Sequence, residues 1–216
     1  MKTTGHIFKE RLHSSDPGTG YGDESREHHT CTATALDYTQ LASGIWVPTF
    51  DGSTTKIDTG SAWMPVGDIS VGGWFYAIGW GESAEGHILA DGKLYIDIED
   101  SGDRFVVSSD GGGTFKNSAN SSVALTTWTY FFVTRTLAGL VNIYLNAVLS
   151  GTANQTSGTP AAGTTNVIIG NRDTDNRTFD GYISGLEIYN YIPSSPTTFA
   201  AARYNEKALL YGRALI

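Results

Sequence analysis

Residues 179–191 read Phe-Asp-Gly-Tyr-Ile-Ser-Gly-Leu-Glu-Ile-Tyr-Asn-Tyr. Up to Ile183 the apolar side chains alternate with polar or amphipathic neighbours, as in a strand with one buried face. From Leu186 onward the apolar positions have the opposite parity. An extra residue at 184–185 keeps both sets on one face, because a β-bulge adds a residue without turning the strand over. The stretch therefore predicts one long strand, bent at Gly185, that needs a partner strand on each side.

Segments with strand character supply such partners along the rest of the chain. Residues 86–90 and 93–99 flank an Asp-Gly pair that is typical of a two-residue hairpin, and 45–50 with 54–58 are predicted to form another hairpin. The other predicted strands are 68–80, 103–110, 128–136, 141–145 and 166–170. Ser195 and Pro196 favour the start of a short helix that ends near Gly212. This pattern predicts an all-β fold, a two-sheet antiparallel jelly-roll sandwich with a short C-terminal helix.

Three parts are expected: an N-terminal extended arm over 1–44, the sandwich over 45–193, and the helix and tail over 194–216. Residues 14–34 offer almost nothing to bury, so they are predicted to form an attachment or subunit-contact segment. Residues 6–12 are expected to make a short helical turn. Cys31 is predicted to be a lone thiol rather than a nucleophile. The histidines of the arm match no zinc spacing; they are His6, His13, His28 and His29.

Composition and charge limit the classes of partner and the location that we expect. The formal net charge of the 216 residues is −8, and no basic cluster is present, which argues against nucleic acid. No apolar run reaches the length of a membrane span. The start, Met-Lys-Thr-Thr-Gly-His, lacks the hydrophobic segment of a secretory signal. The expected location is therefore a virion, or an extracellular or cell-surface site reached after a signal has been removed.

Several short motifs, taken in order, resemble the laminin-G-like, concanavalin A-like lectin/glucanase superfamily over about residues 45–205. The motif segments are 50–53, 69–75, 128–134, 141–149, 168–170, 179–183 and 187–190. The resemblance implies a jelly-roll module of the kind often found in secreted and viral surface proteins.

One predicted strand could carry catalysis. Tyr95, Asp97 and Glu99 are two residues apart and share a face. The resemblance implies comparison with relatives that cleave β-glucans, which use a Glu-x-Asp-x-Glu strand. Here Tyr95 stands where the nucleophile is expected, and a retaining mechanism needs two carboxyl groups. We therefore predict that the chain is not an enzyme, with a glycoside hydrolase of degenerate site as the weaker alternative.

Two kinds of binding site are predicted. Sugar binding needs an aromatic platform with polar groups beside it, and the candidates are Trp63, Trp80, Tyr95, Asp97, Glu99 and Tyr182. Calcium, the one candidate cofactor, needs hard oxygen ligands from loops. Its predicted ligands are Asp51, Asp173, Asp175 and Asp180.

Two principal functions stay open at this point. The first is a non-catalytic structural and recognition module of a larger surface assembly, such as a phage capsid-decoration, fibre or tail protein, that binds glycans. Its partners are expected to be other protein subunits, contacted through the arm, in a homo-oligomer. The second is a secreted, carbohydrate-binding, lectin-like module.

Overall fold

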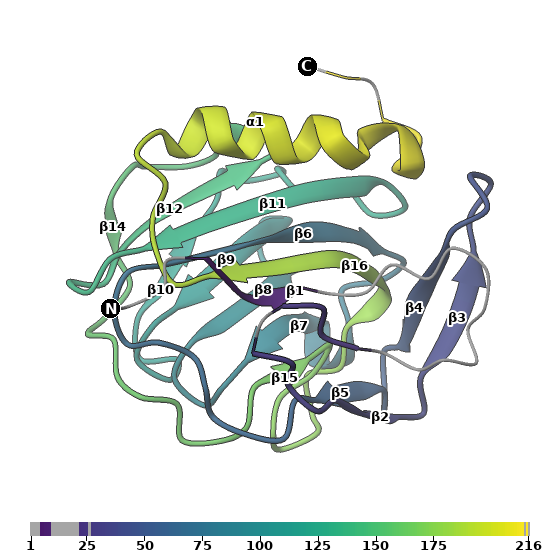
Figure 1. The fold of residues 1–216 in the computed structure, drawn as a ribbon, viewed down its shortest axis with the longest axis horizontal. Coiled ribbons are helices and arrows are strands. Elements are labelled where there is room, and N and C mark those ends of the chain that lie inside the picture. The colour runs from purple at the N-terminus through teal and green to yellow at the C-terminus, as the bar shows by residue number, and fades with distance from the viewer. Residues whose placement is uncertain (1–4, 10–21, 26, 214, 216) are drawn as a thin grey trace.

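The computed structural model describes residues 5–9, 22–25, 27–213 and 215. They form two antiparallel sheets packed as a sandwich, with one helix on the outside (Figure 1). The nine-stranded sheet runs β13 (Val148–Leu149), β12 (Leu140–Leu145), β11 (Trp128–Arg135), β6 (Ile69–Ala77), β16 (Asp180–Tyr189), β4 (Trp46–Asp51) and β3 (Asp37–Gln40), with β1 (His6–Lys9) beside β16 and β14 (Gln155–Thr156) beside β12. The seven-stranded sheet runs β10 (Phe115–Asn117), β9 (Arg104–Ser108), β8 (Tyr95–Glu99), β7 (Glu85–Ala90), β15 (Ile168–Ile169), β5 (Lys56–Asp58) and β2 (Thr32–Thr34). The predicted sandwich is confirmed.

β16 lies at the centre of the larger sheet, as its sequence predicts. It pairs with β6 on one side, and on the other with β4 in its first half and β1 in its second. Its register against β6 shifts between Ser184 and Glu187, where two residues oppose Gly73. Gly185 has a φ of 64°, a left-handed conformation that glycine adopts at no steric cost. The bulge keeps Ile183 and Leu186 buried on the same side, which confirms the predicted bend.

Side chains between the sheets form the main core, and a second apolar cluster covers the outer face of the larger sheet. Four phenylalanines meet in the main core, namely Phe75, Phe105, Phe131 and Phe179. The second cluster lies under α1 (Pro196–Lys207) and the 3-10 turn Ala208–Tyr211, which Gly212 ends in a left-handed conformation. There Trp74 contacts Tyr204 and Tyr211, with ring centroids 5.1 and 4.7 Å apart. The helix is therefore part of the fold, not a separate C-terminal unit.

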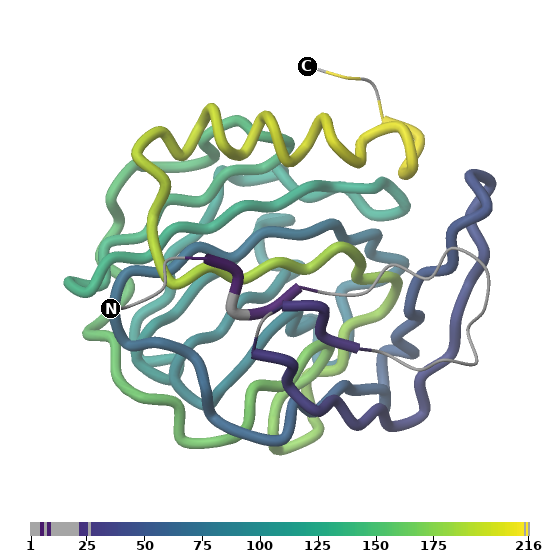
Figure 2. The backbone as a smooth tube through the Cα atoms, in the orientation of Figure 1, coloured from purple at the N-terminus to yellow at the C-terminus, as the bar shows by residue number. Residues whose placement is uncertain are grey.

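The N-terminal region differs from its prediction. His6–Lys9 is a strand paired with β16 instead of a helical turn, and Figure 2 shows this purple segment against the yellow-green backbone of β16. Residues 32–34 and 37–40 add strands to the smaller and the larger sheet respectively. Phe8 is fully buried in the main core. The described parts of 1–44 thus belong to the sandwich rather than to a detached arm, while residues 10–21, including His13, lie outside the described residues.

The predicted 45–58 hairpin is also wrong. β4 pairs within the larger sheet and β5 within the smaller one, so the turn between them joins the two sheets. Asp51 builds this turn, because its carboxylate accepts hydrogen bonds from the backbone N–H groups of Ser53, Thr54 and Thr55. By contrast, the predicted antiparallel pairing of β7 and β8 is confirmed, although Ala90 lies opposite Tyr95 and the connection is therefore longer than the predicted two-residue turn. Within the described part of the chain, no helix is long and apolar enough to cross a membrane.

Candidate ligand-binding site

The outer face of the seven-stranded sheet carries the residues that sequence analysis placed on one strand face. Ile96 and Ile98 of β8 point into the main core, so Tyr95, Asp97 and Glu99 lie on the opposite side, as predicted. Cross-strand pairing extends this face sideways. Tyr95 lies opposite Ser108 of β9, which lies opposite Phe115 of β10. The three side chains therefore form one row across three strands.

A shallow pocket of about 240 Å³ opens above Tyr95. Its wall is the loop that precedes β16, which contributes Arg172, Asp173 and Thr174, and its rim includes Gly92 and Thr164. Asp173, Thr174 and Thr164 are exposed, whereas Tyr95 and Arg172 are half-buried. An aromatic ring thus lies beside a guanidinium, a carboxylate and two hydroxyl groups.

Asn171 holds the loop in place. Its side chain is fully buried and donates a 2.8 Å hydrogen bond to Thr178. The side-chain oxygen Oδ1 of Asn171 accepts hydrogen bonds from the backbone N–H groups of Arg172 and Arg177, at 2.8 and 3.2 Å. Arg172 in turn donates through Nε to Asn176, at 2.7 Å. The pocket wall is therefore fixed before a ligand arrives, which lowers the entropic cost of binding.

Phe115 enlarges the aromatic surface, although no pattern in the sequence indicates it. The side chain is 42% exposed. A Cβ placed on Gly112 would lie 3.3 Å from the Phe115 ring and 3.5 Å from the Tyr95 ring. The two rings thus flank the same glycine, and the absence of a side chain there leaves both of them accessible from the loop.

Beneath the pocket lies a polar cluster of Glu85, His87 and Asp97, in which His87 and Asp97 are buried and Glu85 is half-buried. Glu85 and His87 are two residues apart on β7, and His87 pairs directly with Asp97 of β8. The Nε2 atom of His87 is 3.1 Å from Oε1 of Glu85 and 3.5 Å from Oδ2 of Asp97. Arg177 approaches the other Glu85 oxygen at 3.2 Å. The ring of Tyr95 packs on His87 with centroids 5.0 Å apart, so the cluster supports the floor of the pocket.

The protonation states in this cluster follow from burial. Burial lowers the pKa of His87, so the imidazole is neutral at neutral pH. The hydrogen bond from His87 lowers the pKa of Glu85 to about 2, which keeps this carboxylate ionised. Burial, together with the negative charge of Glu85, raises the pKa of Asp97 well above its usual range. Asp97 is 1% exposed, so it is a poor contact for an external sugar.

The other predicted sugar-binding residues are dispersed. Glu99 is paired with Arg104. Trp63 stacks on His29 and lies parallel to Phe8, so part of its ring surface is already covered, and Trp80 is half-buried against the main core. Tyr182 belongs to the outer face of the other sheet, where it stacks on Tyr76. Of the predicted set, only Tyr95 lines the pocket above the seven-stranded sheet.

The predicted calcium ligands lie in two places. Asp51 and Asp180 are opposite each other on β4 and β16, and Asp51 is already engaged by its own turn. Asp175 forms a 2.7 Å ion pair with Lys56, while Asp173 lines the pocket above Tyr95. In the described ranges no three of these four carboxylates come together. Calcium binding by these aspartates stays a prediction.

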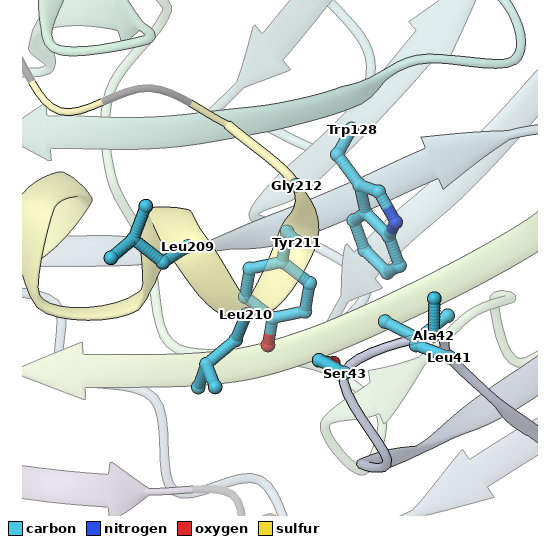
Figure 3. A pocket seen from close by; sticks show the side chains of 8 residues that line it. All are labelled: Leu41, Ala42, Ser43, Trp128, Leu209, Leu210, Tyr211 and Gly212. Atoms are coloured by element: carbon cyan, nitrogen blue, oxygen red, sulfur yellow. The ribbon is translucent and has the colours of Figure 1, made fainter.

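A second concavity of about 390 Å³ lies on the opposite side of the molecule, where the turn between β3 and β4 meets the end of the C-terminal helix. Figure 3 shows Leu41 and Ala42 of that turn facing Trp128 and Tyr211. The two rings are in contact, with centroids 4.5 Å apart. Leu209 beside them is 69% exposed. This pocket is mainly apolar, in contrast to the polar pocket above Tyr95.

Comparisons with known proteins agree with the sandwich fold. A family model described as the concanavalin A-like lectin/glucanases superfamily matches residues 51–197. The receptor-binding domain of botulinum neurotoxin type G is similar in fold, with 14% identity and a TM-score of 0.67 over 94% of this chain and 52% of that one. A botulinum neurotoxin DC binding domain, solved in complex with rat synaptotagmin II, has 10% identity and a TM-score of 0.63 over 93% and 51%. This chain thus spans about half the length of these toxin domains.

Domain 4 of AbnA, a GH43 extracellular arabinanase from Geobacillus stearothermophilus, was solved in complex with arabinotriose. It has 16% identity and a TM-score of 0.62 over 89% of this chain and 98% of that domain. Comparison with curated protein sequences gave no significant match. The family model covers more than half of the chain, and the two-sheet sandwich agrees with it. The chain therefore belongs to the concanavalin A-like lectin/glucanases superfamily.

Proposed function

We propose that this chain is a non-catalytic carbohydrate-binding module whose ligand lies on the outer face of the seven-stranded sheet. The observation that carries the proposal is the pocket above Tyr95, where an aromatic ring adjoins Arg172, Asp173 and two threonine hydroxyls. An aromatic ring packs on the apolar face of a sugar, and charged or hydroxyl groups orient its hydroxyls. Phe115, in the same row on this face, offers a second aromatic ring to the ligand.

The same face supports binding rather than hydrolysis. Asp97 lies under the pocket in a fully buried position, and Glu99 is held by Arg104. The strand therefore presents a tyrosine, not a pair of open carboxyl groups, to a ligand. Two carboxyl groups on either side of the scissile bond are the usual requirement for glycoside hydrolysis.

We also propose that the module acts within a larger surface assembly, such as a phage virion, and forms a homo-oligomer there. The arabinanase domain is one part of a longer enzyme, and a toxin binding domain of this fold was solved in complex with another protein, so modules of this fold occur in larger assemblies. A secreted lectin-like module is the alternative. Detection of the chain in purified virions, as opposed to the particle-free culture medium, separates the two.

A second candidate function is the binding of a protein partner at the apolar pocket in Figure 3. Its exposed Leu209 and its contacting Trp128 and Tyr211 rings suit an apolar side chain of a protein partner. The toxin domain that was solved with synaptotagmin II makes a protein partner relevant to this fold. The two candidate sites lie on outer faces of different sheets, so single substitutions can separate them.

The test is a glycan array probed with the full chain, followed by calorimetry with each positive glycan. Tyr95→Ala and Phe115→Ala are each expected to weaken binding at least about tenfold, or about 1.4 kcal/mol. Leu209→Ala is the matched control, because it truncates an exposed apolar side chain at the other pocket. Unchanged affinity in Tyr95→Ala, or loss only in Leu209→Ala, would rule out the proposed glycan site.

A further inference from the structure

The cluster of Glu85, His87 and Asp97 beneath the pocket has the composition of a metal site. In the described part of the chain it is the one group in which three His, Cys, Asp or Glu ligand atoms lie within 4.8 Å of one another. His87 and Asp97 are almost completely buried. We propose that this cluster binds a divalent transition-metal ion of the Zn²⁺ type, with one imidazole and two carboxylates as ligands.

The distances fit that assignment. Zn²⁺ binds imidazole nitrogen and carboxylate oxygen at about 2.0–2.2 Å with tetrahedral angles. Two ligand atoms of such a site are then about 3.3–3.5 Å apart. Nε2 of His87 lies 3.1 Å from Oε1 of Glu85 and 3.5 Å from Oδ2 of Asp97. One ligand atom from each of the three residues lies within 4.8 Å of the other two.

The backbone holds the three ligands in place. Glu85 and His87 project from the same face of β7, and Asp97 faces His87 from β8. Both strands lie inside the seven-stranded sheet, so their backbone hydrogen bonds fix the positions from which the three ligands project. Arg177, 3.2 Å from Oε2 of Glu85, turns the other oxygen toward His87. Outer-sphere contacts of this kind orient metal ligands in many proteins.

An independent observation supports a missing partner. Among the residues that the structure describes, Oδ1 of Asp97 and Nδ1 of His87 are buried without a hydrogen-bond partner. An unpaired buried carboxyl oxygen is costly, and an ion held by both oxygens of Asp97, Oδ2 beside His87 and the unpaired Oδ1, is one way to satisfy it. Glu85, with 27% of its side chain exposed, gives an ion its way in from the solvent.

The types of ligand present distinguish this site from a calcium site. Calcium takes six to eight oxygen ligands at longer distances, whereas imidazole favours zinc and its neighbours in the first transition series. This site is also distinct from the predicted aspartate set, none of whose four members belongs to it. It lies under the proposed sugar platform, but its occupancy can be tested without any glycan.

The experiment measures zinc retained by the full chain. The protein is stripped with EDTA, incubated with Zn²⁺, passed through a desalting column and analysed by mass spectrometry for bound metal. We expect about one zinc per chain and a higher melting temperature than for the stripped protein. Glu85→Gln and His87→Gln are expected to retain only background zinc. Glu85→Gln changes a partly exposed side chain, so it keeps the test valid if His87→Gln does not fold.

Two controls address other histidines and other ions. The double variant His28→Gln/His29→Gln removes the adjacent histidine pair of the N-terminal region and is expected to retain zinc like the unaltered chain. An equal concentration of Ca²⁺ is expected not to displace the zinc. The proposal is overturned if the unaltered chain retains no zinc, if Glu85→Gln retains as much as the unaltered chain, or if only the double variant loses it.

Discussion

Glu187 is a nearly buried carboxylate at the point where β1, β16 and α1 meet. Tyr189 donates a 2.7 Å hydrogen bond to it, and the cations of Arg203 and Lys207 lie 3.6 and 3.7 Å away. Burial alone would raise the pKa of Glu187. The His6 contact, the two cations and the Tyr189 hydroxyl outweigh burial and lower the pKa to about 2. One side chain therefore links the N-terminal strand and the C-terminal helix to the central strand.

This lowered pKa predicts a loss of stability in acid. A carboxyl group whose pKa is lower in the folded protein contributes stability above its unfolded pKa, about 4.5, and loses it as the pH falls toward 2. The shift corresponds to a contribution on the order of 3 kcal/mol. We expect the difference in unfolding free energy between the unaltered chain and Glu187→Gln to be large near neutral pH and to shrink as the pH falls toward 2. Urea unfolding across this range measures it, and an equal pH dependence in both proteins would contradict it.

At the scale of elements, β1 completes the larger sheet. It occupies the side of β16 that β4 leaves open, and it brings Phe8 into the main core. Phe8→Ala is expected to destabilise the protein by about 3–5 kcal/mol, since truncation of a buried phenylalanine leaves a cavity. Thr34→Ala, at an exposed position of β2, is the control and should change stability little. A small effect of Phe8→Ala in chemical unfolding would show that β1 is dispensable.

The sequence predicts those strands whose own residues show the alternation of apolar and polar side chains. The switch of parity in 179–191 predicts the bulge of β16, and the alternation of β8 places Tyr95 and Asp97 on one face. β1 to β3 could not be predicted, because they are short, their residues are mixed, and their order comes from the strands they join. The turn after β4 is visible in the sequence, but a turn does not reveal which sheet the next strand enters. For the same reason Glu85, His87 and Phe115 were missed, because cross-strand pairing alone brings them to the site.

At the scale of the whole molecule, the nine-stranded sheet is covered on both faces. One face packs against the smaller sheet through the main core, and the other packs under α1 through Trp74 and its aromatic neighbours. β6 and β11 contribute to both clusters, with Trp74 and Phe75 pointing to opposite sides. Loss of packing on one face therefore destabilises β6 and β11, whose other side chains pack in the second cluster.

This shared sheet predicts that α1 and the sandwich unfold as one cooperative unit. Tyr204 is buried against Trp74 and Tyr130, so Tyr204→Ala is expected to cost about 3 kcal/mol. The midpoint should move equally in far-ultraviolet circular dichroism and in tryptophan fluorescence, because coincident transitions indicate two-state unfolding. Leu209→Ala, which is exposed on the neighbouring 3-10 turn, should leave both midpoints in place. If Tyr204→Ala instead produces an early transition for the helix followed by an unshifted one for the sheets, the helix is an independent element that merely rests on the sandwich.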